Sequence, residues 1–338
     1  MLTEIDYIPE QLLQTPADKL HEILSGPTLI HLDGKRRQPL FVSVLLHGNE
    51  YSGWEAIRRV LLQHYNNELP RCLSVFIGNI HAARHARRHL DDQPDYNRVW
   101  NGFDSTEHKM MQSIQESMKL RKVFASIDVH NNTGKNPHYA CINKTDNRFL
   151  QLARMFSSTV VYFIRPDGVQ SKAFAAVCPA VTLECGQPGE ADGIDHAINF
   201  INRCLLLDEI PDTPVDTADI NIFHTIATVK VRQGCSLGIT GEVADLVLHE
   251  SIEDMNMKVI TTGAVFADTT IDGVLPIIVI DHLGNDIAAE YFRVEAGRLV
   301  NYKPVIPSML TLKKEIILDD CLCYLMEEYQ VLSPKNKK

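Results

Sequence analysis

The sequence reads Leu40-Phe41-Val42-Ser43-Val44-Leu45-Leu46-His47-Gly48-Asn49-Glu50 at its first strong structural signal. The stretch begins as a continuous apolar run, which is typical of a strand covered on both faces of a sheet. The run ends at His47, and Glu50 follows three residues later. The stretch therefore predicts a buried strand with ionisable side chains at its carboxyl end.

Strand and helix patterns then alternate as far as residue 207. Apolar runs predict strands at 73–78, 123–130, 159–164 and 180–184. Apolar residues at helical spacing predict helices at 54–65, 106–120, 149–157 and 194–205. This alternation predicts an α/β fold with a mixed, largely parallel sheet and helices on both faces. Residues 79–102 are polar and crowded with Arg, His and Asp, so a long surface loop is expected there.

The pattern changes after residue 207. A stretch rich in proline and acidic residues, 208–214, is typical of a linker. Short β-rich runs at 224–231, 258–261, 275–280 and 288–294 follow, and a last helix is expected at 318–329. We therefore predict two domains, an α/β domain at 1–207 and a smaller β-rich domain at 208–338.

Composition narrows the classes of partner. The 338 residues include 33 Lys and Arg against 43 Asp and Glu, a net charge of −10, which argues against nucleic acids and anionic membranes as partners. No secretory signal and no apolar stretch of about 18–20 residues is seen. The eight cysteines are scattered without a CxxC pair and are expected to be reduced thiols. We expect a cytoplasmic protein, and a homo-oligomer stays open.

Three predicted strand ends carry reactive side chains. His47 and Glu50 follow one strand, His130 ends another, and Glu184 ends a third. Functional groups gather at the carboxyl ends of strands in α/β sheets. Two imidazoles and a carboxylate suit a catalytic zinc with one open position. Asp128 lies two residues before His130, on the same face of the strand, where it suits a carboxylate that orients a ligand.

Each of these signals has an ordinary structural explanation when it is taken alone. A single HxxE motif has little specificity, and a histidine at a strand end is more often a hydrogen-bonding residue than a ligand. His81, His85 and His89 also have helical spacing, but the arginines among them favour a solvated basic face. A serine or cysteine hydrolase is disfavoured, because Cys185, the cysteine beside Glu184, has no clear histidine partner in the sequence.

Four motifs taken together carry a resemblance. They occur in the order His47-Gly48-Asn49-Glu50, Asp95-Tyr96-Asn97-Arg98, Asp128-Val129-His130-Asn131 and Leu183-Glu184-Cys185-Gly186. The chain resembles the succinylglutamate desuccinylase/aspartoacylase family, within the zinc carboxypeptidase (M14-like) superfamily, over about residues 40–205 and more loosely beyond. The resemblance implies one Zn²⁺ per chain, held by His47, Glu50 and His130. It also implies that Glu184 is the catalytic general base and acid.

The resemblance implies roles for the arginine-rich loop as well. Asn97 and Arg98 match a pair that grips the substrate carboxylate. Arg88 matches an arginine that stabilises the oxyanion, provided that two residues are inserted before Asp95; Arg87 is the alternative. Four arginines in the loop, at 84, 87, 88 and 98, favour an anionic small-molecule substrate.

The sequence also departs from the family pattern. Aspartoacylases carry a further arginine about ten residues before the catalytic glutamate, where this chain has Phe174, with Lys172 nearby. Lysine is a point charge without the planar fork of arginine, so the acyl group recognised here stays open. The loop after His130 is long and polar, and His138 or Tyr139 in it is a further candidate for facing the site.

We therefore predict a zinc-dependent hydrolase that cleaves the amide bond of a small anionic N-acyl amino acid. The domain at 1–207 would carry the chemistry, and the domain at 208–338 would shape substrate access. The first alternative is a carboxypeptidase-like metallopeptidase that acts on short peptides. The second is a non-catalytic binding protein that retains the fold.

Overall fold

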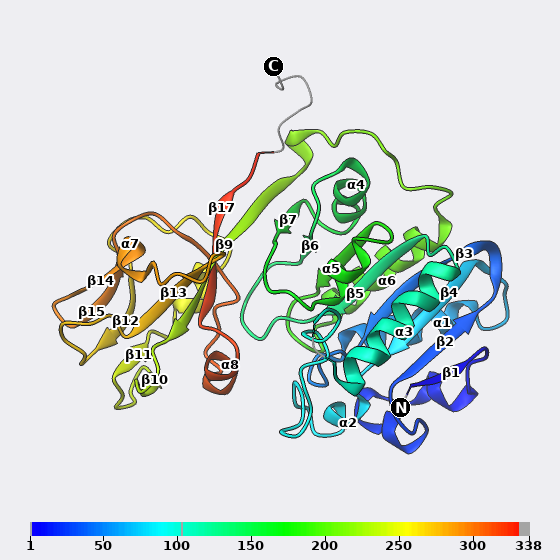
Figure 1. Ribbon diagram of the computed structural model, residues 1–338, viewed down its shortest axis with the longest axis horizontal. Coiled ribbons are helices and arrows are strands. Elements are labelled where there is room, and N and C mark those ends of the chain that lie inside the picture. Colours follow the sequence, from blue (N-terminus) through cyan, green and yellow to red (C-terminus); the bar gives the residue numbers. More distant parts are fainter. Residues whose placement is uncertain (1, 103, 331–338) are drawn as a thin grey trace. The chain divides into compact units, whose positions relative to one another are not determined.

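The computed structural model describes residues 2–102 and 104–330 (Figure 1). The chain divides into two compact units. An α/β unit contains the chain up to Asn131 together with His138–Asn221, and a β-rich unit contains Asn132–Pro137 together with the chain from Ile222 onward. Domains with the bounds 1–207 and 208–338 stay a prediction.

The α/β unit is built around one sheet. Its strands lie in the order β1 (Thr3–Ile5), β2 (Thr28–Leu32), β4 (Leu69–Ile77), β3 (Gly34–Val44), β5 (Ala125–His130), β8 (Ala180–Glu184), β6 (Tyr139–Ile142) and β7 (Thr159–Tyr162). The pairs β2–β4 and β6–β8 are antiparallel, and the other neighbours run parallel. The predicted mixed, largely parallel sheet is confirmed.

Helices cover both faces of this sheet. They are α1 (Ser52–His64), α2 (Ile80–Ala83), α3 (Thr106–Leu120), α4 (Asn147–Phe156), α5 (Gln170–Phe174) and α6 (Ala191–Leu206), with 3-10 turns at Glu10–Gln14, Ala17–Glu22 and Thr217–Asp219. Gly53 of α1 lies against Val44 and Val129. The ring of Phe41 stacks on Phe174 of α5, with centroids 4.7 Å apart. Because Phe41 and Val44 point to opposite faces, α1 and α5 lie on opposite sides of β3.

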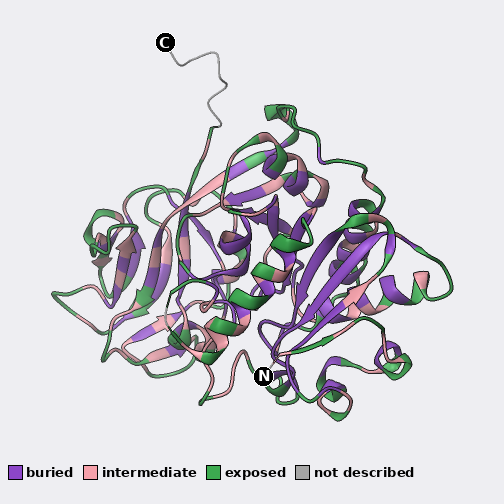
Figure 2. Cartoon of the chain, turned by 45° about the vertical axis from the view of Figure 1, so that its right-hand side comes forward, coloured by how far each residue is buried: buried purple, intermediate pink, exposed green. Residues whose placement is uncertain are grey.

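The apolar run at residues 40–46 is buried in this arrangement. Leu40, Phe41 and Val42 are 0% exposed, and the strands of the sheet are largely buried (Figure 2). Burial on both faces explains why the run is continuous rather than alternating. Among the helices that the structure describes, none is both long and apolar enough to cross a membrane.

The β-rich unit holds the remaining strands. These are β9 (Asn221–Val231), β10 (Leu237–Ile239), β11 (Leu246–Leu248), β12 (Val265–Thr269), β13 (Ile277–Asp281), β14 (Phe292–Glu295), β15 (Arg298–Asn301), β16 (Ile306–Ser308) and β17 (Cys323–Glu328), with short helices at Ile252–Met255, α7 (Ala288–Tyr291) and α8 (Lys314–Asp319). One sheet has the order β10-β11-β12-β15-β14. Strand β9 pairs with both β13 and β17. Phe266 and Phe292 meet edge to face in the core.

Three predictions in this region are wrong at least in part. The run expected to be β-rich at 288–294 is helix α7 as far as Tyr291 and is strand only from Phe292. Residues 318–329 do not form one helix, because Cys323–Glu328 is strand β17, which lies between β9 and β16. Cys323 and Leu325, two residues apart, are both 0% exposed, which is the period of a strand. Residues 258–261 form no strand, and only Ile260 makes an isolated bridge there.

Candidate metal centre and active site

The first site residues lie on a sharp turn after β3. Leu45 adopts a left-handed conformation, with φ of 56°, and its carbonyl accepts a hydrogen bond from the Asn79 amide. The Gly48 amide donates to the carbonyl of Arg88 at 3.1 Å. A Cβ at Gly48 would lie 2.2 Å from the backbone nitrogen of Ala83 in α2. Only glycine therefore allows α2 and the segment after it to pack against this turn.

We expect Gly48→Ala to lower the free energy of unfolding by about 1–3 kcal/mol, the usual cost of forcing atoms into a packed region. Urea unfolding measures this change. Gly263→Ala is the control, because open space surrounds that position and only backbone strain at φ +90° results. A Gly48→Ala protein as stable as wild type would show that α2 does not pack tightly on the turn.

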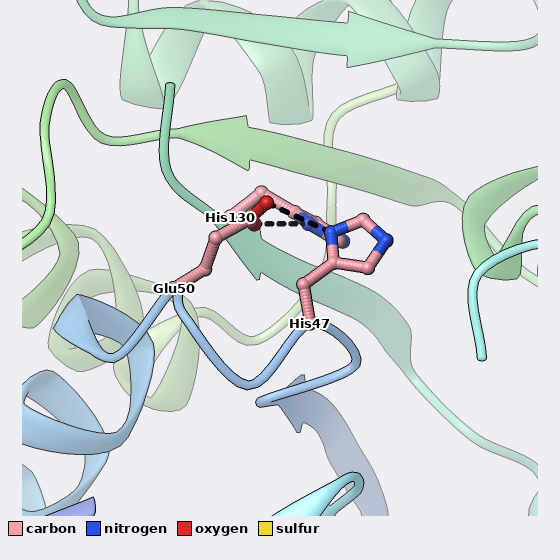
Figure 3. Close-up of side chains that lie close together, drawn as sticks. All are labelled: His47, Glu50 and His130. Atoms are coloured by element: carbon pink, nitrogen blue, oxygen red, sulfur yellow. Dashed lines mark hydrogen bonds and ion pairs between the residues drawn. The ribbon is translucent and has the colours of Figure 1, made fainter. Parts of the chain in front are cut away.

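Three buried side chains form a cluster that can hold a metal ion. Nδ1 of His47 lies 2.8 Å from Oε1 of Glu50, and Nδ1 of His130 lies 2.7 Å from Oε2 of the same carboxylate (Figure 3). One potential ligand atom from each residue lies within 4.8 Å of the others. The carboxylate thus stands between two imidazole nitrogens that both face it.

Each imidazole is oriented from behind by a second carboxylate. Nε2 of His47 lies 3.0 Å from Oδ1 of Asp95, and Nε2 of His130 lies 2.8 Å from Oδ2 of Asp128. The Ser43 hydroxyl donates to the other oxygen of Asp128 at 2.7 Å. A carboxylate on the outer nitrogen fixes the tautomer and the direction of a metal-binding histidine. Two nitrogens and one carboxylate, held in this way, fit a catalytic zinc.

The electrostatics of the cluster also favour a bound cation. Burial acts to raise the pKa of Glu50, but the charges of His47 and His130 hold that pKa well below its usual range. Burial acts to lower the pKa of His130, but Asp128 and Glu50 raise it well above its usual value. The buried carboxylates therefore need positive charge here. A divalent cation supplies that charge when the imidazoles are neutral ligands.

Asn131 joins the turns that carry the cluster. Its backbone amide donates to Oε2 of Glu50 at 3.1 Å, and its side-chain Nδ2 donates to the carbonyl of Gly186 at 2.9 Å. Its Oδ1 accepts a hydrogen bond from the backbone of Ser52, at the start of α1. In the sequence, Asn131 stands in one of the four motifs, but no local pattern there gives it a role. Its position directly after His130 was the available signal.

Glu184 lies at the end of β8, in register with His130 on the neighbouring strand β5. Its side chain is buried, and Oε2 has no hydrogen-bond partner among residues 2–102 and 104–330. Burial raises the pKa of Glu184 to about 8, and the nearby charge of His130 opposes that rise. Buried polar atoms are normally hydrogen-bonded, so this oxygen is an exception, and a catalytic role for Glu184 stays a prediction.

The structure separates the two candidate oxyanion residues. Arg88 donates from Nε to Oδ2 of Asp95 at 3.0 Å, and its side chain is largely buried. Arg87 instead pairs with Asp91 in an exposed ion pair. Asp95 therefore links Arg88 to His47, a connection that the sequence analysis missed. Of the two arginines, Arg88 is the one beside the cluster.

Asn97 and Arg98 border the same cluster. Oδ1 of Asn97 accepts a hydrogen bond from the Gln170 backbone at 2.9 Å, and Nδ2 lies 3.2 Å from Nε2 of His130. Arg98 donates to the Asn97 carbonyl, and its charge helps to hold the pKa of Asp95 well below its usual range, against burial and together with His47 and Arg88. Substrate binding by Asn97 and Arg98 stays a prediction.

Comparison with known proteins assigns this arrangement to a family. A model of the succinylglutamate desuccinylase/aspartoacylase catalytic domain matches residues 38–206, half of the chain. The chain belongs to the succinylglutamate desuccinylase/aspartoacylase family. The resemblance inferred from the four sequence motifs is therefore confirmed. A search of curated protein sequences found no match.

Solved structures of this family share the fold. Succinylglutamate desuccinylase from Chromobacterium violaceum is 15% identical, with a TM-score of 0.55 over 88% of this chain and 87% of that one. A succinylglutamate desuccinylase/aspartoacylase from Rhodobacter sphaeroides is 13% identical, with a TM-score of 0.58 over 90% and 89%. Murine aminoacylase 3 is 14% identical, with a TM-score of 0.59 over 88% and 97%. At these identities the likeness establishes the fold alone.

The structure also places the residues at which this sequence differs from the family pattern. Phe174, at the position where aspartoacylases carry an arginine, is 0% exposed and stacks on Phe41. Lys172 donates to Asp167 at 2.5 Å. The ring of His138 lies 5.2 Å from that of His196. Tyr139, which is buried, pairs directly across from Glu184 in an antiparallel ladder. Directly opposed residues share a face, so Tyr139 is the nearer candidate to the site.

Proposed function

We propose that this protein is a zinc-dependent hydrolase that cleaves the amide bond of a small anionic N-acyl amino acid. The observation that carries the proposal is the buried Glu184 carboxyl, which lies in register with His130 and has one oxygen without a hydrogen-bond partner in the part of the chain that the structure describes. Family membership supports the reaction class, because the family's named members are deacylases. Arg88 and Arg98, the two arginines of the loop that the structure places beside the cluster, support an anionic substrate.

The metal would be held by His47, Glu50 and His130. When bound, zinc supplies a Lewis acid that polarises the scissile carbonyl and makes water acidic enough to lose a proton near neutral pH. The carboxylates of Asp95 and Asp128 keep both imidazoles directed at the ion.

The chain's own residues would move the proton and hold the substrate. Glu184, whose pKa burial raises, would take a proton from the attacking water and return it to the leaving nitrogen. The Arg88 guanidinium, fixed by Asp95, would stabilise negative charge that develops on the carbonyl oxygen. Asn97 and Arg98 would hold the free carboxylate of the substrate.

The metal assignment predicts one zinc per chain. We expect His47→Ala or His130→Ala to lower the zinc content to nearly zero, because a site with three protein ligands loses most of its zinc affinity when one ligand is removed. His89→Ala, in the arginine-rich loop outside the cluster, is the control and should keep its zinc. Metal analysis after reconstitution with zinc and dialysis measures the content. Wild-type protein that retains no divalent ion would overturn the metal assignment.

The substrate assignment is tested by release of free amine. Wild-type protein is expected to hydrolyse N-acyl amino acids with acidic character in preference to short peptides. A panel of N-acyl amino acids beside di- and tripeptides, scored for free amine, makes the comparison. Faster hydrolysis of the peptides would favour the carboxypeptidase-like alternative, and no hydrolysis of either by zinc-loaded protein would favour a binding protein.

A further inference from the structure

One segment near the metal centre packs in the β-rich unit. Strand β5 ends at His130, and the chain continues through Asn131 into Asn132–Pro137. Asn132–Pro137 belongs by its contacts to the β-rich unit, whereas the chain on both sides of it belongs to the α/β unit. We call Asn132–Pro137 the tether segment.

Asn256 is the main hydrogen-bonding partner of the tether segment. Its side chain is 4% exposed. Nδ2 donates to the carbonyl of Lys135 at 3.0 Å and to the carbonyl of Leu310 at 2.9 Å. Oδ1 accepts a hydrogen bond from the Leu310 amide at 2.8 Å. One buried amide therefore joins the tether segment to the chain after β16.

Two further contacts hold the tether segment at the same place. A Cβ at Gly134 would lie 1.9 Å from the carbonyl oxygen of Leu310, so the two backbones touch directly. The Met309 amide donates to Oδ1 of Asn136 at 3.3 Å. Met309 itself adopts a left-handed conformation, with φ of 66°, which a non-glycine residue holds only where its surroundings enforce it. The tether segment is thus fixed along its length.

We propose that Asn256 is a positioning residue for the metal centre, acting through the tether segment on Asn131 and His130. The connection is short, because Asn131 directly precedes the tether segment and its amide donates to Oε2 of Glu50. Displacement of the tether segment therefore moves Asn131. This residue follows the ligand His130 in the chain, and its backbone amide holds the ligand Glu50. This inference rests on the proposed metal site. It adds that a residue of the β-rich unit helps to position the metal ligands.

Asn256→Asp separates this role from general stability. The aspartate keeps the shape of the side chain and the acceptor for the Leu310 amide, but it replaces two donated hydrogen bonds by contacts between oxygen atoms. Asn301→Asp is the matched control. Asn301 is equally buried in the β-rich unit, donates to the carbonyls of Thr261 and Lys303, and accepts from Ala264, away from the tether segment.

Two measurements on the full-length variants test the proposal. Hydrogen exchange of metal-free protein should show the peptide at 125–137 exchanging about tenfold faster in Asn256→Asp, and unchanged within about twofold in Asn301→Asp. Zinc affinity, measured by competition with a chelator, should fall about tenfold in Asn256→Asp alone, at the low end for residues that support metal ligands. Urea unfolding establishes that both variants lose comparable global stability.

The outcomes are distinct. Equal effects of the two variants on exchange at 125–137, or no effect of Asn256→Asp, would overturn the proposal. If Asn256→Asp does not fold, Asn136→Ala removes the acceptor for the Met309 amide, and it should raise exchange at 125–137 about threefold. A wild-type protein that binds no zinc would refute the proposed function, whereas exchange at 125–137 would still decide the role of Asn256.

Discussion

Glu184→Gln is expected to lower kcat by about 1,000-fold while the protein keeps its zinc. A positioned general acid and base contributes roughly 100- to 10,000-fold to rate, and an amide cannot accept or return a proton at this position. Glutamine has the shape of glutamate, so packing at the end of β8 is preserved. Initial rates on the N-acyl amino acid that the screen selects, combined with metal analysis, measure both parts of the expectation.

The environment of Glu184 explains why the effect should appear in kcat. The side chain is buried, no described residue forms a hydrogen bond with its Oε2, and burial raises its pKa to about 8. Such a group contributes little to holding the ground state and acts on the proton that moves during the reaction. The Michaelis constant is therefore expected to change little.

Glu190→Gln is the matched control for this prediction. Glu190 lies six residues further on, is exposed, and accepts a hydrogen bond from the Gln187 amide. Its substitution should leave kcat within about twofold of wild type, as for a surface residue away from the chemistry. Wild-type turnover in the Glu184→Gln variant would remove Glu184 from the mechanism.

The strand ends were predictable because each is a local pattern. The apolar runs before His47, His130 and Glu184 are continuous, and parallel strands bring their carboxyl ends to one end of the sheet. The structure confirms that sheet, and it places His130 and Glu184 in register on neighbouring strands. These strands could be predicted from the sequence alone, because burial on both faces of the sheet requires a continuous run of apolar residues.

Of the two carboxylates behind the imidazoles, Asp128 was predictable from its place two residues before His130 on one strand, but Asp95 was not. Asp95 lies in a loop without periodicity, so nothing local relates it to His47, 48 residues earlier. Strand β17 was mistaken for a helix because its apolar residues fit either period over so short a stretch. Its pairing with β9, about a hundred residues earlier in the chain, makes this segment a strand rather than a helix. The role of the tether segment depends on Asn256, which is equally remote in sequence.

Arg98→Ala is expected to lower kcat/KM by about 30-fold to several thousand-fold with zinc content unchanged. Under the proposed function, Arg98 forms a charge-assisted contact with the free carboxylate of the substrate. Loss of such a contact costs on the order of 2–5 kcal/mol when the partner charge stays buried. A factor of ten in rate corresponds to about 1.4 kcal/mol, which gives the range. Steady-state kinetics and metal analysis on the same preparation measure the two quantities.

The Arg98 prediction is specific to carboxylate recognition. Arg98→Lys should recover only part of the loss, because an ammonium group cannot reproduce the planar fork of a guanidinium. Arg87→Ala, in the same loop but paired with Asp91 at the surface, should stay within about twofold of wild type. In wild type, an N-acyl amino acid should be hydrolysed faster than its α-amide, and Arg98→Ala should narrow that difference. Equal rates on the two substrates in wild type would mean that Arg98 binds no carboxylate and that its charge acts only on Asp95 and the loop.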